Sequence, residues 1–454
     1  MHLKQSKTVT RRNMLKIGSA FAGLGAMTTL GKHGIGWAQS VGGFDDYKAL
    51  VCIFMRGGND AINTVVPNTD QGYADYQAAR RYLSVERNSL LAFGDQTHGF
   101  NPNLAELHQL YERGQMALLA NVGMLVQPVT QAEIHSGAPL PDQLFSHSSQ
   151  FAQWGRGFAH RSLETGWCGR MADMLDAQHQ SHLAMNVSLS GHNLMQTGAS
   201  AHPNQISSRG ATQLFIDSQS GHAGDQLRGA HQALSDLSAR EGNIFERAFN
   251  RLQGRARQVN TLINDGLQRS GEVQTSFPRS SLGENLQAIA RMIAARAEFG
   301  LSTGRQVFFV THGGYDTHDN QLRSHPFLLR ELSQALGAFH QATVDLGVAR
   351  AVTTFTNSEF GRRINVNTDG TDHGWGGHQF IIGGAVRGGE TYGTLPQILL
   401  GGPDDNGDGH LIPTTSVEQY AATLANWFGL NPEQQGHLFP NLMNFSQTNL
   451  GFMG

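Results

Sequence analysis

Lysine is the residue type that this 454-residue chain most clearly lacks, because Lys48 is the only lysine after residue 38. The scarcity excludes a phosphate-binding P-loop beyond the N-terminus and leaves Lys48 as the one candidate there for Schiff-base chemistry. After residue 38 the chain holds 27 lysine and arginine residues against 36 acidic residues. This acidic balance argues against binding to nucleic acid or another polyanion, so no nucleic-acid partner is expected.

Cysteines and long apolar runs are also scarce. Cys52 and Cys168 are too few for a disulfide scaffold or a cysteine-rich zinc site. Cys52 lies in an apolar run and is interpreted as a small buried side chain, with one bridge between the two cysteines as the alternative. No segment has 18 consecutive apolar residues, so we expect no stable membrane span after processing.

The N-terminus has the pattern of an export signal. Residues 1–38 carry six basic residues and no acidic residue. The string TRRNMLK at residues 10–16 precedes a mild apolar run and resembles the twin-arginine signal, Ser/Thr-Arg-Arg-x-apolar-Leu-Lys. We therefore expect residues 1–38 to be a twin-arginine signal peptide, with the twin-arginine translocase as the export partner and the periplasm as the destination. A basic cytoplasmic tail is the alternative.

Residues 39–454 are predicted to form a single α/β domain. Continuous apolar runs indicate buried strands at Ala49–Met55, Ala117–Val122, Gln306–Thr311 and Ala351–Thr356. Helical periodicity separates the runs at 104–111, 282–293 and 329–339, and a last helix is expected after a capping box of Thr415 and Glu418 and before Gly429. This alternation predicts a central, mostly parallel sheet with helices on both faces. The polar segment around 200–280 is interpreted as a helical insertion or cap.

The loops after the predicted strands carry acids and histidines. RGGNDAIN follows the first strand, HGGYDTH the third and NSEFGR the fourth. Parallel strands bring their carboxyl ends to one edge, so we expect one shared site there. Two glycine-rich loops, HGGYDTH and TDHGWGGH, offer imidazole and carboxylate ligands for a divalent metal: Asp316, His318, Asp372, His373 and His378. Asp60 and Glu359 are further candidates, with a helix cap and a structural ion pair as their respective alternatives.

A nucleophile is expected to be a hydroxyl near these ligands. Ser146 in LFSHSSQ is the candidate, because a metal can activate a hydroxyl, and an ordinary helix-capping serine is the alternative. Arg56 and Arg362 are candidates for neutralising charge that develops on a substrate. The segment 404–409 is similar to the first half of a calcium loop, but Thr415 stands where that loop needs glutamate, so zinc or manganese is favoured over calcium or magnesium.

Seven longer motifs carry a family resemblance. They are RGGNDAINTVVP, FSHSSQFAQW, TGWCGRMADML, THGGYDTH, TFTNSEFGR, GTDHGWGGHQFIIGGAVRGG and LIPTTSVEQYAATLANWFG. In this order, from about Lys48 to Leu430, they resemble the domain-of-unknown-function family 1501, which is grouped with the alkaline phosphatase and sulfatase superfamily. The resemblance implies an alkaline-phosphatase-like α/β sandwich with a two-metal hydrolytic site.

The resemblance also implies roles for individual residues. Asp60 matches the first metal-binding acid, Asp316 with His318 the Asp…His pair, Asp372-His373 the Asp-His pair, and His378 the final histidine. One departure is Ser358-Glu359-Phe360-Gly361, where relatives have Ser-Asp-His-Gly. Neither cysteine lies in a sulfatase signature, which disfavours a formylglycine nucleophile.

The sequence therefore predicts an exported hydrolase of phosphate or sulfate esters that uses two divalent ions. Its substrate is expected to be a small-molecule ester or an ester of an envelope polymer. The alternative is a non-catalytic cell-envelope binding or assembly protein that retains the fold.

Overall fold

The computed structural model describes residues 43–454, apart from 160–161, 212–219 and 242. The predicted twin-arginine signal lies outside the described residues. Within them, no helix is both long enough and apolar enough to cross a bilayer. The domain limits and the insertion predicted from the sequence stay predictions.

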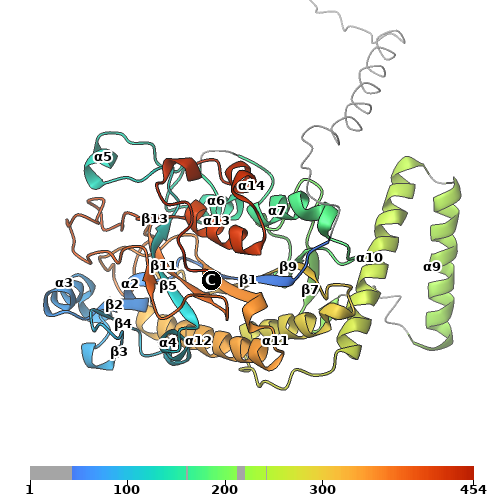
Figure 1. Cartoon of the computed structure of the whole chain (residues 1–454), viewed down its shortest axis with the longest axis horizontal. Coiled ribbons are helices and arrows are strands. Elements are labelled where there is room, and N and C mark those ends of the chain that lie inside the picture. The colour runs from blue at the N-terminus through green and yellow to red at the C-terminus, as the bar shows by residue number, and fades with distance from the viewer. Residues whose placement is uncertain (1–42, 160–161, 212–219, 242) are drawn as a thin grey trace, which may run out of the picture. The chain divides into compact units, whose positions relative to one another are not determined.

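A ten-stranded sheet forms the centre of the fold (Figure 1). Its order is β12-β5-β11-β10-β1-β9-β6-β7-β8, and β13 also pairs with β5. The strands are β1 (Tyr47–Arg56), β5 (Met116–Gly123), β6 (Asn186–Ser188), β7 (Asn204–Ser207), β8 (Gly210–Ala211), β9 (Gly304–Gly313), β10 (Val352–Asn357), β11 (Gly377–Ile382), β12 (Thr391–Tyr392) and β13 (Thr415–Ser416). The four apolar runs predicted as strands correspond to β1, β5, β9 and β10.

Strand β1 is buried on both faces, as its continuous apolar sequence predicts. Ala49, Val51 and Ile53 point into one hydrophobic core, and Leu50 and Cys52 point into the other. The strand pairs in parallel with β10 on one side and β9 on the other. Parallel neighbours need crossover connections, and these connections supply the helices that cover the sheet.

Helices cover both faces of the sheet (Figure 1). One layer contains α4 (Ala105–Glu112), α11 (Ser281–Ala294) and α12 (Gln321–Asp345). The other contains α6 (His147–Arg156), α7 (Trp167–Leu175), α13 (Val417–Phe428) and α14 (Pro432–Leu438). The predicted α/β class, with a mostly parallel sheet between helices, is confirmed.

The capping box of α13 was predicted one residue too early. Ser416 and Gln419 form it, because Thr415 pairs in β13 with Val122 of β5. Gly429 ends the helix as expected, with φ of 130°.

The remaining elements lie around the sheet. A small sheet contains β2 (Val65–Pro67), β3 (Leu91–Ala92) and β4 (His98–Phe100), and the further helices are α2 (Ala61–Thr64), α3 (Asp70–Arg80), α5 (Gln131–His135), α9 (Gly221–Glu241) and α10 (Ile244–Arg269).

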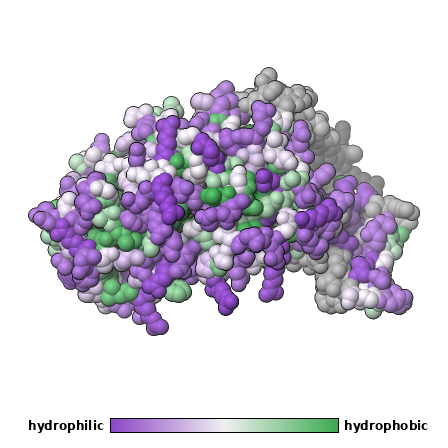
Figure 2. All heavy atoms as spheres, turned by 60° about the horizontal axis from the view of Figure 1, so that its bottom comes forward, coloured by the Kyte–Doolittle hydropathy of each residue, from purple (hydrophilic) through white to green (hydrophobic). Residues whose placement is uncertain are grey.

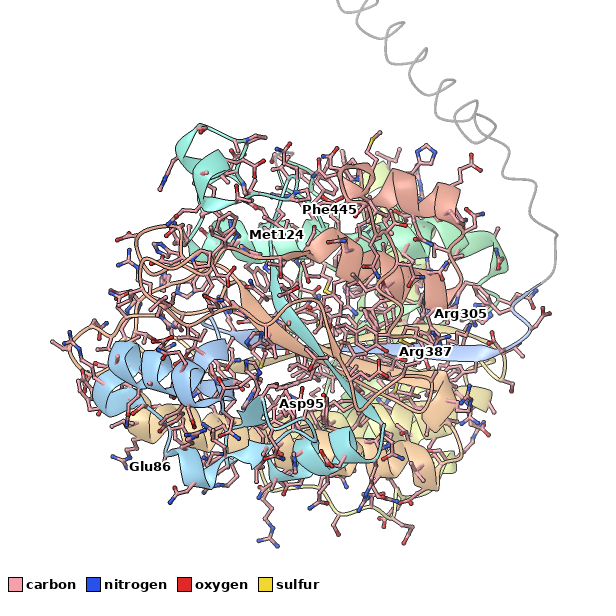
Figure 3. The ribbon with its side chains drawn as sticks, turned by 60° about the vertical axis from the view of Figure 1, so that its left-hand side comes forward. Glu86, Asp95, Met124, Arg305, Arg387 and Phe445 are labelled. Carbon is pink, nitrogen blue, oxygen red and sulfur yellow. The ribbon has the colours of Figure 1, made fainter. Side chains whose placement is uncertain are left out.

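Side chains fill the space between the sheet and its helices (Figure 3). Arg305 of β9 is labelled in that view. It forms an ion pair at 2.8 Å with Asp46, just before β1, and donates to the carbonyl of Phe428 at the end of α13, so it links the two strands to that helix. Cys52 and Cys168 are free and buried in the same core, where burial raises the pKa of both thiols.

Several strands end at one edge of the sheet. In the parallel pairs, Met55 lies beside His312 and Phe54 beside Asn357, so β1, β9 and β10 finish together. Strand β11 runs antiparallel to β10, so its beginning reaches the same edge. The loops that carry the predicted site residues therefore meet here.

Candidate metal centre

The loop after β1 packs tightly against the loop after β9. Gly57 has φ of 122°, and a side chain there would collide with the backbone of Tyr315 and Asp316. Only glycine fits such a position without strain. The backbone N–H of Tyr315 also donates to the carbonyl of Arg56 at 3.2 Å. These contacts place Asp316 beside the end of β1.

Arg362 fixes the carboxylate of Asp316. The arginine is fully buried, and its Nη2 donates to Oδ1 of Asp316 at 2.6 Å. The same Nη2 also donates to the carbonyls of Gly57 and Tyr315, while Nε and Nη1 donate to the carbonyls of Gly58 and Thr371. Burial raises the pKa of Asp316, but the hydrogen bond and charge of Arg362 outweigh burial and hold the pKa below its usual value. Asp316 is thus an oriented, ionised group.

Backbone pairing brings the TDHGW loop to the same place. Arg362 and His373 form an antiparallel bridge, and the N–H of Arg363 donates to the carbonyl of Asp372 at 3.0 Å. The loop precedes β11 and reaches the edge because that strand is antiparallel to β10.

Three imidazole rings surround Asp316. The Nε2 atoms of His318 and His373 lie 3.1 and 3.2 Å from its Oδ1, and the Nε2 of His147 lies 3.3 Å from its Oδ2. The Nε2 atoms of His318 and His373 are only 3.0 Å apart. One acid and three histidines therefore form a single cluster.

Each of these rings turns its Nδ1 toward an oxygen atom. The partners are Asp372 Oδ1 for His318 at 3.0 Å, the carbonyl of Phe145 for His373 at 2.7 Å, and Glu359 Oε1 for His147 at 2.9 Å. Carbonyl and carboxylate oxygens only accept hydrogen bonds, so each Nδ1 carries a proton. In the neutral ring Nε2 then presents a lone pair. Lone pairs that face one another and a carboxylate repel unless a cation lies between them.

The cluster fits a divalent cation. Burial lowers the pKa of His373, which keeps its ring neutral near pH 7. Tetrahedral zinc with bonds of about 2.0–2.1 Å holds its ligand atoms roughly 3.3 Å apart. Four contacts in the cluster, at 3.0–3.3 Å, are close to that value. The ligand atoms of His147, Asp316 and His373 all lie within 4.8 Å of one another. Oxygen acceptors behind the Nδ1 atoms are also the usual device for orienting metal-binding histidines.

Glu359 and Phe360 occupy the positions where the sequence departs from Ser-Asp-His-Gly. Glu359 is buried, and its Oε1 accepts from the N–H of Gly57 at 2.9 Å as well as facing His147. The ring of Phe360 stacks on His373 with centroids 4.5 Å apart and lies 4.8 Å from His147. Glu359 therefore orients the ring of His147 through a hydrogen bond, and Phe360 packs against the rings of His147 and His373.

His147 is the member of the cluster that the sequence reasoning missed. It is the first residue of α6 and directly follows Ser146, the proposed nucleophile. The available signal was the histidine within FSHSSQ, a motif from which only the serine was selected.

Asp60 and His378 do not join the cluster. Both carboxylate oxygens of Asp60 are bound by Arg80, at 2.6 and 2.9 Å, and the residue caps α2. The Nδ1 of His378 accepts from the backbone N–H of Asn121 at 3.1 Å, and burial lowers its pKa to about 3. Asp372 reaches the cluster only through His318. The contacts of Asp60 are those of its alternative interpretation, a helix cap, with an ion pair added.

The candidate catalytic residues differ in accessibility. Ser146 precedes α6, and its Oγ lies 3.4 Å from the Oγ of Ser148. Arg56 is exposed at the end of β1 and lies over the ring of Phe151. Arg362 is buried with its donors engaged, so its placement is that of a positioning residue for Asp316. The catalytic roles of Ser146 and Arg56 stay predictions.

Comparisons with solved structures find distant similarities. The crystal structure of Ps i-CgsB in complex with k-i-k-neocarrahexaose is 8% identical, with a TM-score of 0.38 over 88% of this chain and 76% of that chain. PsFucS1 sulfatase from Pseudoalteromonas sp. is 9% identical, with a TM-score of 0.35 over 85% and 68%. The lipoteichoic acid synthase LtaP from Listeria monocytogenes is 8% identical, with a TM-score of 0.35 over 90% and 79%. Similarities of this size carry no conclusion about activity.

None of the curated proteins matches this chain. A family model described as a protein of unknown function, DUF1501, matches residues 47–435. This match spans most of the sequence, and the chain belongs to the DUF1501 family.

Proposed function

We propose that this protein is a metal-dependent hydrolase of phosphate or sulfate esters. The observation that carries the proposal is the convergence of three histidine Nε2 atoms on the carboxylate of Asp316, with every Nδ1 held by an oxygen acceptor. His147, His318, His373 and Asp316 would hold the cation. A divalent metal there supplies Lewis acidity toward an ester oxygen and a lowered pKa for bound water.

The residues around the cluster have separate tasks in this proposal. Arg362 keeps Asp316 ionised and oriented. Glu359 and Asp372 orient His147 and His318 through their Nδ1 protons. Ser146, next to His147 in the chain, is proposed as the nucleophile, with water as the alternative.

Substrate access is open in this arrangement. The side chains of Asp316 and His318 are 45% and 43% exposed. An ester carried on a polymer can approach such a site as readily as a small molecule can. Arg56, exposed where β1 ends, is the cation proposed to contact the anionic group.

We propose fewer ions than the sequence predicts. Two ions were expected. Among the described residues one group has ligand atoms close enough for an ion, His147, Asp316 and His373, while Asp60 and His378 are engaged elsewhere. We therefore propose one ion, zinc or manganese. Export by the twin-arginine route to the periplasm remains part of the proposal.

Metal content and ester hydrolysis together test the proposal. Purified protein is loaded with Zn²⁺ or Mn²⁺, and bound metal is measured alongside the hydrolysis of aryl phosphate and aryl sulfate esters. Asp316→Asn should lose both metal and activity. Asp319→Asn, an exposed carboxylate three residues along the same loop, is the matched control and should keep both.

The outcomes separate the two functions considered. Hydrolysis that is lost only in Asp316→Asn supports the enzyme. One equivalent of metal without hydrolysis of any ester supports a metal-containing envelope binding protein, and no metal after loading overturns the site itself.

A further inference from the structure

The pair of helices α9 and α10 carries an unusual concentration of exposed apolar side chains. The two helices lie side by side (Figure 1). Seven of the fifteen exposed large hydrophobic side chains among the described residues are here: Leu227, Leu234, Leu237, Ile244, Phe245, Phe249 and Leu252. On the face seen in Figure 2, hydrophobic residues of the rest of the protein form small patches among hydrophilic ones. Exposed apolar side chains gathered on one pair of helices are typical of an interaction site.

The helices contact each other through polar residues. Along each helix, the less exposed positions recur every three or four residues: Gly224, Arg228, His231 and Ser235 on α9, and Asn250, Gln253, Arg257 and Asn260 on α10. The side chain of Asn250 donates to the backbone carbonyl of Ser235 at 3.3 Å. A helix pair that is stable alone in water buries its apolar stripes, whereas this pair turns them outward.

The apolar stripes have heptad spacing. They are Leu227, Ala230, Leu234 and Leu237 on α9, and Phe245, Phe249, Leu252, Ala256, Val259 and Ile263 on α10. The steps of three and four residues are those of a helix-bundle seam.

Both stripes lie on one face of the pair. Most stripe residues come one position before a contact residue, as Leu234 does before Ser235 and Leu252 before Gln253. Each stripe is therefore rotated by about 100° from the helix contact, in the same sense. Because the helices are antiparallel, equal rotations bring the stripes to the same side. We call Leu227, Leu234, Leu237, Phe245, Phe249 and Leu252 the hairpin face.

The C-terminal part of the α10 stripe packs against the rest of this chain. Val259 and Ile263 are buried at 7% and 1% exposure in the core beneath the sheet. Phe249 and Leu252, on the same stripe, are 58% and 67% exposed. The seam therefore continues past the point where this chain supplies a partner.

We propose that the hairpin face pairs with the same face of a second copy of this chain. Two such faces complete a four-helix arrangement with two-fold symmetry. The narrow stripes favour helix packing over insertion into a bilayer, which needs a broad apolar face. The six side chains are 47–82% exposed, so pairing two faces would bury the apolar centre of an interface, whose usual size is about 800 Å² per copy.

The test measures the oligomeric state of the full chain by sedimentation velocity from nanomolar to micromolar concentration. The unaltered protein should be dimeric at micromolar concentration. A Leu234→Glu and Phe249→Glu double variant should raise the dimer dissociation constant by at least about 100-fold. Arg251→Glu adds a carboxylate to the same helix, off the apolar stripe, and should leave the dimer intact. Circular dichroism verifies helix content, and a milder Leu234→Ala and Phe249→Ala pair should weaken the dimer without adding charge.

Three results would overturn the proposal. One is a monomer at every concentration, and another is a dimer that both double variants leave unchanged. The third is a monomer that binds vesicles of anionic phosphatidylglycerol and loses this binding in the glutamate variant, which would assign the face to a membrane.

Discussion

Asp60 and Asp316 follow neighbouring parallel strands at the same sheet edge, yet their carboxylates have different surroundings. Asp60 is fully buried, and Arg80 binds both of its oxygens while Gln321 binds one of them as well. Asp316 is 45% exposed, and Arg362 binds only Oδ1. Its Oδ2 faces the Nε2 of His147.

The difference shows what separates a structural acid from a candidate ligand. A buried carboxylate with every oxygen occupied by donors has no free acceptor for a metal, and its removal leaves a guanidinium uncompensated. A carboxylate that faces imidazole lone pairs is instead stabilised by a cation, because the cation relieves the repulsion. Position after a strand is common to both residues and does not distinguish them.

The largest expected effect is the loss of stability when Asp60, the buried acid, is replaced. Asp60→Asn leaves the charge of Arg80 buried without its partner and should lower the free energy of unfolding by about 3–5 kcal/mol. Denaturant titration measures the loss. Asp70→Asn removes an exposed pair with Arg87 and should cost less than about 1 kcal/mol, and an equal loss in both variants would contradict the distinction.

Asp316→Asn should show the reverse pattern. We expect metal affinity and ester hydrolysis to fall more than about 100-fold, since even residues that only orient ligands contribute 10–100-fold. The thermal midpoint of the metal-free variant should also fall, because the buried Arg362 loses its charged partner. The fall should be smaller than for Asp60→Asn, because Asp316 is half exposed and Arg362 keeps its backbone carbonyl acceptors. Unfolding of the metal-free variant comparable with that of Asp60→Asn would place Asp316 among the structural acids.

The orienting carboxylates should have intermediate effects. Glu359→Gln replaces the charged acceptor behind His147 with a neutral one and should weaken metal binding by about 10–100-fold. Isothermal titration with Zn²⁺ measures the affinity. Glu331→Gln alters a carboxylate that faces His312 away from the cluster and should bind metal normally, so similar losses in both variants would argue against a specific role for Glu359.

The smallest expected effect is on the pH dependence of stability, and it comes from a buried histidine near Asp60. His325 contacts Asn59, next to Asp60, and burial lowers its pKa to about 4. The unfolded chain binds a proton near the ordinary pKa of 6.5, so the contribution of His325 to stability is complete above pH 6.5 and is lost as the pH falls toward 4. At pH 5.5 the loss should be about 1.4 kcal/mol.

Thermal unfolding between pH 7.5 and 5.5 measures this dependence. His325→Gln should flatten the profile relative to the unaltered protein. His182→Gln, at an exposed position, should not change the slope. Parallel slopes for all three proteins would show that His325 titrates normally in the fold.

Local patterns predicted much of this arrangement. Continuous apolar runs identified β1, β5, β9 and β10, because strands buried on both faces need apolar residues at every position. The glycine-rich loops at the strand ends identified Asp316, His318 and His373 as neighbours. Asp316 and His318 meet the end of β1 because β1 and β9 are parallel, whereas His373 arrives in the loop before the antiparallel strand β11.

Local patterns could not predict contacts between residues that are far apart in the sequence. His147 opens α6, far in sequence from Asp316, and only the packing of that helix brings its ring to the sheet edge. Arg80 reaches Asp60 from the end of α3, which converts a candidate ligand into half of a buried ion pair. No spacing rule links either pair, since each contact depends on how separate elements pack.

The sequence by itself determined the class of fold, the acidic and lysine-poor character of the chain, and the edge at which acids and histidines gather. These properties depend on composition and on periodicity over a few residues. The tertiary structure alone decided which carboxylates are satisfied by arginine and which face imidazole lone pairs. It also decided that the apolar stripes of α9 and α10 face outward, because the direction of a side chain depends on which neighbour its element packs against.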